Sequence, residues 1–327
     1  MIGQIPASSS WKRLRGSCVA KTLVIGGNGF IGSHLVDALS LAGHDVTAFD
    51  RFSASDPVFS AKNVAVLPGE FLSRADLDSA VRGQDYVLHF LSTTTPATAE
   101  SDPTLDIRTN IAQTVELLES CVAAGVKRFY YASTGGAIYG PQGKADYAET
   151  DRALPISPYG IGKLSIEHYL HYFRIKHDLK STALRISNPY GTRQKANKKQ
   201  GLIPIALRQI VLGRPVIRMG DGSMVRDYVF VEDLVQMLTP MVGVETEFDL
   251  YNIGSGVGHS VSEIIDSLRR VTQIDFGITE LPIPPTFVDR VVLNTDRYRS
   301  EFGASRLTAL DDGVRFTFEE IRAQTHD

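Results

Sequence analysis

The sequence predicts an α/β protein in which helices cover both faces of a doubly wound parallel sheet, followed by a smaller C-terminal lobe. From Lys21 onward, short runs of β-branched residues alternate with stretches of helical periodicity, which is typical of a parallel sheet buried on both faces. A glycine-rich turn, GGNGFIG, joins the first run to the first helical stretch. After about residue 187 the alternation loosens, and the remaining chain is long enough to form a second lobe.

Six β-branched or aromatic runs predict the strands of the large sheet. In chain order they are TLVIG, VTAF, VAVL, YVLHF, RFYYAS and TALRI. Long helices are expected over residues 105–124 and 159–177, where apolar residues recur with helical spacing. Farther on, the pattern predicts a helix at IPIALRQIVLG, a strand at MVRDYVFV, a helix over 231–241, a strand at LYNIG and a helix that begins at Ser260 or Ser262.

The composition restricts the classes of partner and site. The 327 residues carry a net charge of −3, so strong attraction to nucleic acid or to an anionic membrane is not expected. No apolar run in the sequence approaches the ~20 residues that span a bilayer. The two cysteines form no CxxC motif and the histidines lack zinc-ligand spacing, so we expect no metal site and a reducing compartment, the cytoplasm.

The stretch TLVIGGNGFIGSHLVDAL predicts a Rossmann-like turn that binds a dinucleotide. Gly26, Gly29 and Gly32 lie between a strand and an amphipathic helix, where they permit a tight turn, close approach of a pyrophosphate and close packing of the helix. The positive end of the helix dipole then faces the anion. Asp50 ends the second strand, where a carboxylate binds a ribose 2′-hydroxyl and favours NAD over NADP. The neighbouring Arg51 weakens this preference, because guanidinium groups bind a 2′-phosphate.

A tyrosine and a lysine supply the candidate chemistry. In SPYGIGKLSIEHYL, Tyr159 and Lys163 are four residues apart at the start of a helix, so both side chains project from one face. An ammonium near a phenol favours the phenolate, and we therefore expect the pKa of Tyr159 to be lowered from about 10 toward the working pH. Such a tyrosine can act as general base toward an alcohol. On its own, a YxxxK pattern favours an ordinary packed tyrosine and a surface lysine.

Together these motifs resemble the extended short-chain dehydrogenase/reductases, in particular the sugar-nucleotide epimerases and dehydratases related to UDP-glucose (galactose) 4-epimerase. The resemblance covers residues 21–312 and rests on GGNGFIG, VLHF, DIRTN, STGGAIYG, YGIGK, LRISNPYGTRQ, GDGSMVRDYVFVEDL and YNIGSG, in this order. The chain then divides into an N-terminal extension (1–20), a NAD-binding Rossmann domain (21–187, with return segments near 227–258) and a substrate-binding lobe (188–226 and 259–327).

The resemblance implies roles for the matching residues. Tyr159 exchanges a proton with a sugar hydroxyl, and Lys163 holds the nicotinamide ribose. The implied cofactor-binding residues are Gly26, Gly29, Phe30, Ile31, Gly32, Asp50, Arg51, Phe90 and Asn110, together with Tyr159 and Lys163. The implied substrate ligands are Thr94, Asn188, Arg226 and Arg290, with Arg226 paired to the substrate pyrophosphate. The family also implies NAD as the cofactor, a nucleotide sugar (a UDP-hexose) as the substrate, and a homodimer formed through the two long helices.

Two positions depart from the family pattern. The usual catalytic Ser or Thr falls on Gly135, which has no side chain, so the hydroxyls of Thr134 and then Ser133 are the alternatives. The late arginine-rich phosphate segment is poorly matched in IPPTFVDRVVLNTD, where Arg290 is only a candidate.

The residues after that hydroxyl favour epimerisation. Sequences that resemble dehydratases and decarboxylases carry an acid there, whereas this chain has Gly136 and Ala137, which cannot transfer protons. We therefore expect oxidation by NAD at C4 of the sugar, with Tyr159 as the base, and return of the hydride to the other face of a 4-keto sugar. Two alternatives remain: an NAD(P)-dependent oxidoreductase, such as a 4-keto-sugar reductase or an alcohol dehydrogenase, and an inactive dinucleotide-binding regulator.

Overall fold

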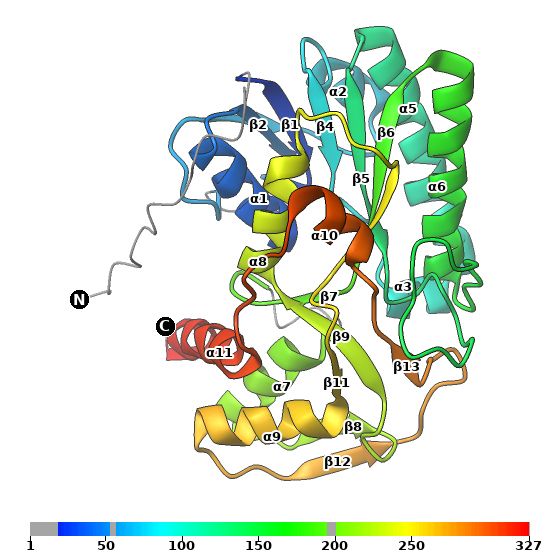
Figure 1. The fold of residues 1–327 in the computed structure, drawn as a ribbon. Coiled ribbons are helices and arrows are strands. Elements are labelled where there is room, and N and C mark those ends of the chain that lie inside the picture. The colour runs from blue at the N-terminus through cyan, green and yellow to red at the C-terminus, as the bar shows by residue number, and fades with distance from the viewer. Residues whose placement is uncertain (1–18, 53–56, 195–200, 327) are drawn as a thin grey trace.

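Seven parallel strands form the large sheet of the structure, a computed structural model that describes residues 19–52, 57–194 and 201–326 (Figure 1). Most of the expected N-terminal extension, residues 1–18, lies outside the described residues. The strand order is β10-β6-β5-β4-β1-β2-β3 with parallel pairing throughout, which confirms the predicted doubly wound fold. The strands are β1 (Lys21–Ile25), β2 (Asp45–Asp50), β3 (Val64–Pro68), β4 (Tyr86–His89), β5 (Arg128–Thr134), β6 (Lys180–Ile186) and β10 (Leu250–Ile253).

The strand order reverses between β1 and β4. The chain runs from β1 outward through β2 and β3, and then crosses back to place β4 on the other side of β1. In open sheets of this kind, ligands bind in the crevice at the carboxyl ends of the strands where the order reverses. The loops that follow β1, β4 and β5 are therefore the segments in which to look for a site.

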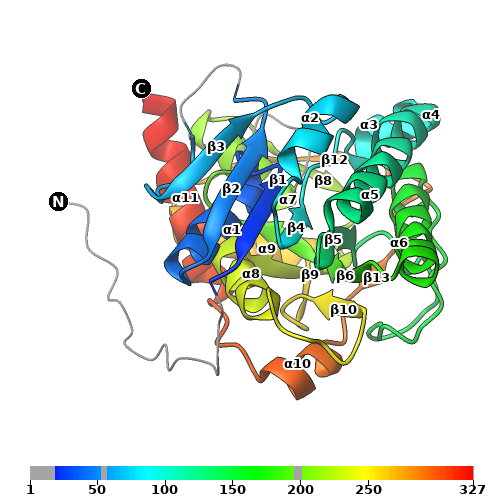
Figure 2. The same cartoon turned by 90° about the horizontal axis from the view of Figure 1, so that it is seen from above.

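Helices cover both faces of the sheet (Figure 2). α1 (Phe30–Leu41) and α8 (Val231–Leu238) lie on one face, and α2 (Arg74–Ala80), α5 (Ala112–Ala124) and α6 (Pro158–His177) lie on the other. The alternation of side chains along β1 explains both layers. Val24 belongs to the apolar core under α1 and α8, whereas Leu23 and Ile25 belong to the core under α2, α5 and α6.

The long helix expected over 105–124 is divided in the structure. α3 (Pro96–Ser101) and α4 (Pro103–Asp106) lead into a π-helical turn, η1 (Ile107–Ile111), which continues into α5. Short π-helical turns inside α-helices are frequent at functional sites. This one begins directly after Asp106 and contains Asn110, which bears on the site below. The helix expected over 159–177 is confirmed as α6.

β9 (Val225–Phe230) is the centre of the second lobe. It pairs with β7 (Asn188–Tyr190), β11 (Gly258–Ser260) and β13 (Arg290–Val291), and β8 (Val216–Met219) pairs with β12 (Ile278–Leu281). α7 (Leu202–Val211), α9 (Val261–Thr272) and α11 (Leu310–His326) share one apolar core beside these strands. Ser260, rather than Ser262, begins α9, because its hydroxyl and the carboxylate of Glu263 form a reciprocal capping box.

The later chain also returns to the large sheet. α8 and η2 (Thr239–Met241) pack on α1, β10 forms the edge strand beside β6, and α10 (Asp296–Phe302) packs on β10. Residues 227–258 are thus shared between the two lobes, since β9 and β11 belong to the smaller sheet.

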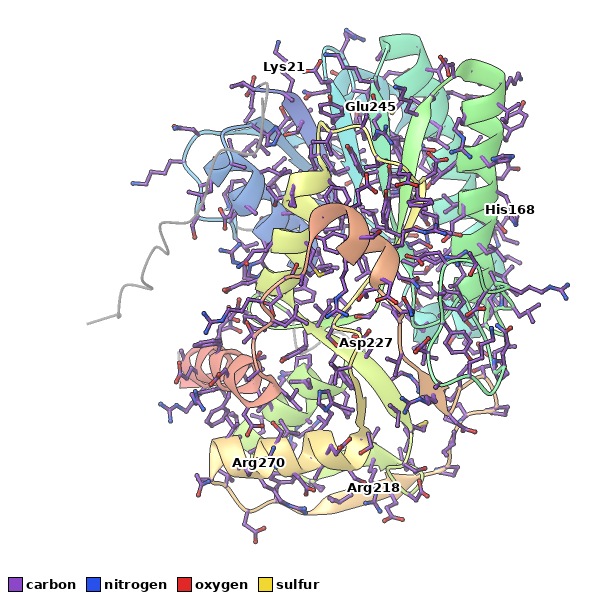
Figure 3. The ribbon with its side chains drawn as sticks, viewed as in Figure 1. Lys21, His168, Arg218, Asp227, Glu245 and Arg270 are labelled. Carbon is purple, nitrogen blue, oxygen red and sulfur yellow. The ribbon has the colours of Figure 1, made fainter. Side chains whose placement is uncertain are left out.

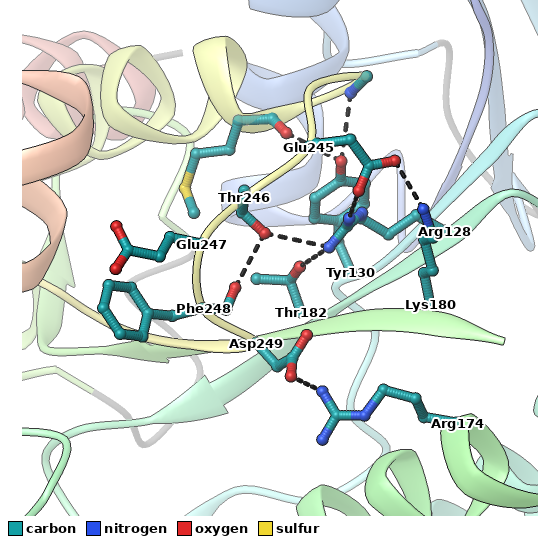
Figure 4. A network of polar contacts seen from close by, with 12 residues as sticks. Arg128, Tyr130, Arg174, Lys180, Thr182, Glu245, Thr246, Glu247, Phe248 and Asp249 are labelled. Atoms are coloured by element: carbon teal, nitrogen blue, oxygen red, sulfur yellow. Dashed lines mark hydrogen bonds and ion pairs between the residues drawn. The ribbon is translucent and has the colours of Figure 1, made fainter. Parts of the chain in front are cut away.

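A polar network joins the segment before β10 to the amino ends of β5 and β6 (Figure 4). Arg128 is 4% exposed, and its guanidinium donates to Glu245 at 2.9 Å and to the hydroxyl of Thr246 at 3.1 Å. It also donates to the hydroxyl of Thr182 at 3.1 Å. Lys180 pairs with the same Glu245 from a more exposed position. Arg128 and Lys180 begin β5 and β6, so the network lies at the amino ends of the strands, away from the carboxyl ends where ligands bind. It therefore attaches the segment before β10 and does not belong to the site.

We expect Arg128→Ala to lower the free energy of unfolding by about 2–3 kcal/mol, because it leaves buried hydroxyls without their donor and removes packed methylenes. Lys180→Ala removes a cation from the same Glu245 at an exposed site and should change the free energy by less than about 1 kcal/mol. Urea denaturation of both variants checks the difference. Equal losses in the two variants would contradict the assignment of Arg128 as the anchor.

Candidate active site

The turn after β1 fits a pyrophosphate. Gly26 has φ +86°, and a Cβ there would lie 2.9 Å from the backbone nitrogen of Leu91. A Cβ at Gly32 would overlap the carbonyl oxygen of Gly26, so only glycine lets α1 start this close to the strand. Gly29 is the N-cap of α1, and within the described chain no side chain caps this end. The first backbone N–H groups of α1, at Phe30 and Ile31, thus have no capping side chain, an arrangement that fits an anion.

Asp50 lies beside this turn at the end of β2. One carboxylate oxygen accepts a hydrogen bond from the backbone N–H of Asn28 at 3.1 Å, and the other accepts from the N–H of Arg51 at 2.8 Å. The carboxylate is thus held at the edge of the phosphate loop, where the sequence places the ribose of the cofactor. Arg51 is exposed next to it. Glycine turn, helix terminus and carboxylate together fit the adenosine half of NAD.

The loop after β4 is fixed by Asn110 from the π-helical turn. The amide oxygen of Asn110 accepts from the backbone N–H and the hydroxyl of Thr93, each at 3.0 Å. Its amide nitrogen donates to the hydroxyl of Thr94 and to Asp106. All donors and acceptors of this amide are occupied, and Thr94 is buried with its hydroxyl bound on both sides. Asn110 and Thr94 therefore hold the loop in shape, and their roles as cofactor and substrate ligands stay predictions. Phe90 lies partly buried at the start of the loop.

Tyr159 and Lys163 come together in the first turns of α6. Ser157 caps the helix and Pro158 occupies its first turn, so the local sequence fixes where the helix begins. The ammonium of Lys163 lies 5.6 Å from the centre of the Tyr159 ring and donates to the carbonyl oxygen of Ala132 at 2.8 Å. The predicted pair is thus formed, at the carboxyl end of β5.

The expected pKa of Tyr159 is wrong for this structure. Burial raises the pKa of Tyr159 to about 12, and the carboxylate of Asp106 acts in the same direction. Burial also lowers the pKa of Lys163 to about 8, against the opposing effect of Asp106 and Glu167. The sequence argument considered only the ammonium; desolvation of the phenolate is the larger effect here.

The two candidate hydroxyls, of Ser133 and Thr134, differ in their hydrogen bonds and in the face of β5 on which they lie. Ser133 donates to the carboxylate of Glu167 at 2.5 Å, and Arg185 holds that carboxylate with two hydrogen bonds of 2.8 and 3.1 Å. Thr134 points to the opposite face of β5, and its hydroxyl makes no hydrogen bond with any residue that the structure describes. A Cβ at Gly135 would lie 2.5 Å from a methyl group of Leu293, so Leu293 fills the space of the missing side chain.

The smaller lobe contributes Asn188 and Arg226. Asn188 donates to the carbonyl oxygen of Asp227 at 2.9 Å, and a Cβ at Gly136 would lie 3.3 Å from its amide oxygen. Arg226 donates only to backbone carbonyls and forms no ion pair with a described carboxylate; burial lowers its pKa. A partly buried cation without a counter-ion among the described residues fits a site for an anionic ligand.

Arg290 does not join Arg226. In the register of β13 and β9, Arg290 pairs with Val225 and Val291 pairs with Arg226. Neighbouring residues of a strand point to opposite faces, so the two arginines lie on opposite faces of the small sheet. Arg290 donates to the carbonyl oxygen of Ala145 instead. His259 is the residue directly opposite Arg226 on β11, on the same face.

Sequence reasoning missed Asp227, which lies where the two lobes meet (Figure 3). Its side chain is fully buried, and its oxygens accept from the backbone N–H groups of Ser255 and Gly256 and from the hydroxyl of Ser255. Burial raises the pKa of this carboxyl, and the hydrogen bonds oppose that effect. Asp227 thereby fixes the turn after β10 next to Asn188. The sequence feature that could have indicated Asp227 is its position in VRDY, directly after Arg226.

The described ranges contain neither a metal-binding cluster nor a membrane-spanning helix. Among residues 19–52, 57–194 and 201–326, no group of three or more His, Cys, Asp or Glu side chains is arranged to hold a metal ion. No helix in that part of the chain is both long and apolar enough to cross a membrane.

Comparison with known proteins assigns the chain to a family. Residues 22–254 match the NAD dependent epimerase/dehydratase family. The chain belongs to this family. The assignment confirms the resemblance predicted from the motifs, and with it an NAD-dependent enzyme whose cofactor is NAD.

Similar proteins cover almost the whole chain. UDP-glucose 4-epimerase of Mycolicibacterium smegmatis is 32% identical over 314 residues, which are 92% of this chain and 98% of the relative. dTDP-4-dehydro-6-deoxyglucose reductase of Escherichia coli is 29% identical, over 92% of this chain and 98% of the relative. The crystal structure of UDP-glucose 4-epimerase with UDP-glucose from Thermotoga maritima is 33% identical, with a TM-score of 0.87 over 93% of this chain and 99% of that chain.

We expect Asp50→Asn to weaken NAD binding about 10-fold to 100-fold, since hydrogen bonds to a charged acceptor contribute about 1.5–3 kcal/mol. The loss for NADP should be smaller, because the substitution also removes a repulsive charge. Isothermal titration calorimetry with both dinucleotides measures this. Asp45→Asn, at the other end of β2, is the matched control and should bind NAD like the parent protein.

Proposed function

We propose that this protein is an NAD-dependent epimerase that inverts C4 of a nucleotide-activated hexose, with a UDP-hexose as the first candidate. The observation that carries the proposal is the Tyr159–Lys163 pair beside a turn, Gly136–Ala137, that has no acid for elimination or decarboxylation. Asn188 partly occupies the space over Gly136, so an acid at that position has little room. The likeness to UDP-glucose 4-epimerases from several organisms supports the same reaction.

In this reaction, Tyr159 transfers the proton and Lys163 assists it. Tyr159 takes the proton of the C4 hydroxyl while the C4 hydrogen leaves as hydride, and it returns the proton after the 4-keto sugar has turned over. When bound, NAD would supply the hydride acceptor and donor, and its positive charge would favour the phenolate against the raised pKa of Tyr159. Lys163 acts in the same direction and holds the nicotinamide ribose. No net oxidation results, so NAD stays bound through turnover.

Thr134 is the hydroxyl that assists Tyr159. Its side chain is uncommitted among the described residues, whereas Ser133 is bound to Glu167. A hydroxyl that donates to the C4 oxygen stabilises the charge that develops there. Arg226 pairs with the pyrophosphate of the substrate, because it is the partly buried guanidinium on this side of the cleft that forms no ion pair with a described residue.

A net oxidoreductase is the second candidate function. The similarity to a dTDP-4-dehydro-6-deoxyglucose reductase over nearly the full chain favours it. Such an enzyme releases its cofactor after each turnover. The two functions therefore differ in the amount of cofactor consumed for each molecule of product, which can be measured.

The purified protein is incubated with UDP-glucose, UDP-N-acetylglucosamine and UDP-glucuronate, and the products are separated by chromatography. We expect the C4 epimer of at least one of these sugars without consumption of added NAD. Accumulation of NADH in proportion to product, or consumption of NADPH with a 4-keto sugar, would instead establish the oxidoreductase.

Tyr159→Phe should lower kcat by about 10²–10⁴-fold, because it removes the general acid and base. NAD binding should persist, since the ring remains. Tyr169→Phe, farther along α6 at an exposed position, loses the same hydroxyl away from the site and should retain parent activity. Unchanged turnover in the Tyr159 variant would show that another group moves the proton.

Thr134→Ala should lower kcat about 10-fold to 100-fold with little change in stability, as expected for one hydrogen bond to a developing charge. Ser133→Ala should act mainly on stability, because it leaves Glu167 with one donor fewer. Initial rates and thermal melting of both variants separate these effects. A loss of kcat in Ser133→Ala with unchanged kcat in Thr134→Ala would assign the assisting role to Ser133.

We also propose a homodimer formed through η1 and α6. Large apolar side chains are exposed there, and an isologous interface would bury them on both subunits. They are Ile107, Ile161, Tyr169, Tyr172 and Ile175. Light scattering measures the mass in solution. The cytoplasmic location stays a prediction from cysteine usage.

A further inference from the structure

Asp106 is a buried carboxylate against the catalytic helix that the sequence analysis did not single out. It is the last residue of α4, directly before the π-helical turn, and is 4% exposed. One of its oxygens accepts from the hydroxyl of Thr94 at 2.5 Å and from the amide of Asn110 at 2.7 Å. A buried carboxylate costs free energy unless its surroundings compensate the charge.

The other oxygen of Asp106 lies against Gly162. A Cβ at Gly162 would overlap this oxygen, so α6 can approach the carboxylate only because residue 162 is glycine. Gly162 directly precedes Lys163 and follows Tyr159 by three residues. The carboxylate therefore meets α6 at the turn that carries both catalytic side chains.

We propose that Asp106 is a positioning residue for the catalytic pair: its carboxylate joins the loop after β4 to the Gly162 turn of α6 and sets the charge around Tyr159 and Lys163. The proposal rests on the epimerase function given above. Asp106 touches neither substrate nor cofactor in this assignment, and acts through the two residues that do. Asp106 and Asn110 are four residues apart, so their side chains share one helix face, and the amide of Asn110 donates to Asp106 there.

The charge of Asp106 shifts the pKa values of Tyr159 and Lys163 in the same direction. The carboxylate of Asp106 raises the pKa of both Tyr159 and Lys163. It therefore favours the charged ammonium of Lys163 and disfavours ionisation of the Tyr159 phenol. Four ionisable groups face the pair from the surrounding elements: Asp106 from α4, Glu167 from α6, Tyr131 from β5 and His89 from β4. Only Asp106 acts on both members as an anion.

The test uses Asp106→Asn, which keeps the shape and removes the charge. The acidic limb of the pH–kcat profile should move to lower pH by about one unit, because the phenolate becomes easier to form. The tyrosinate absorbance of the protein should show one tyrosine ionising at lower pH. That component should be absent in the double variant Asp106→Asn, Tyr159→Phe.

Asp102→Asn is the matched control, four residues earlier and exposed, where Asn caps α4 as well as Asp does. It should leave both curves unchanged. A lower rate in Asp106→Asn with both curves unmoved would overturn the proposal and leave Asp106 a packing residue. If the parent protein epimerises no sugar but the tyrosine titration still moves, the proposed function fails and the placement of Asp106 stands.

A double-mutant cycle tests the geometry without activity. Gly162→Ala alone should destabilise the protein strongly or leave it unfolded, because its methyl group overlaps the carboxylate. Asp106→Ala makes room for that methyl group, so Gly162→Ala should cost much less in the Asp106→Ala background. Additive effects on thermal melting would show that the two residues are not in contact, against the proposal.

Discussion

The hydrogen bond from the Lys163 ammonium to the carbonyl oxygen of Ala132 is the contact on which the site depends. It fixes α6 to the carboxyl end of β5 and buries a cation, since Lys163 is 9% exposed. A buried ammonium requires compensation. The carboxylates of Asp106 on α4 and Glu167 on α6 supply it, and both raise the pKa of Lys163 against burial. The charges on α4, α6 and the end of β5 therefore act together, and the pKa of Tyr159 cannot be predicted from Lys163 alone.

The two carboxylates differ in what they hold. Glu167 binds Ser133 and Arg185, and so ties α6 to two neighbouring strands of the large sheet. Asp106 binds the loop after β4 and lies against Gly162. Asp227 has the same function in the smaller lobe, where it gathers the turn after β10 onto β9. Buried acids that accept several hydrogen bonds thus set the positions of the loops that line the cleft.

Local patterns were enough to predict much of this protein. The strands, α6 and the glycine turn follow from periodicity and from residues such as Gly32, whose constraint lies within a short stretch of chain. The π-helical turn, the raised pKa of Tyr159 and the opposite faces of Arg226 and Arg290 could not be predicted in this way. The raised pKa of Tyr159 depends on its burial and on Asp106, which is far from it in sequence, and the faces of the two arginines depend on the register of β13 on β9.

The missing side chain at Gly135 illustrates how such contacts limit what a motif implies. Leu293, from the end of the chain's return through the smaller lobe, occupies the space where a serine or threonine would lie. The neighbouring hydroxyls of Ser133 and Thr134 lie on β5, where alternation directs them to opposite faces. Glu167 binds Ser133 on the face toward α6, whereas Thr134 points to the opposite face and forms no hydrogen bond with a described residue. Under the proposed function, Thr134 would supply from the other face of the strand the hydroxyl that Gly135 lacks.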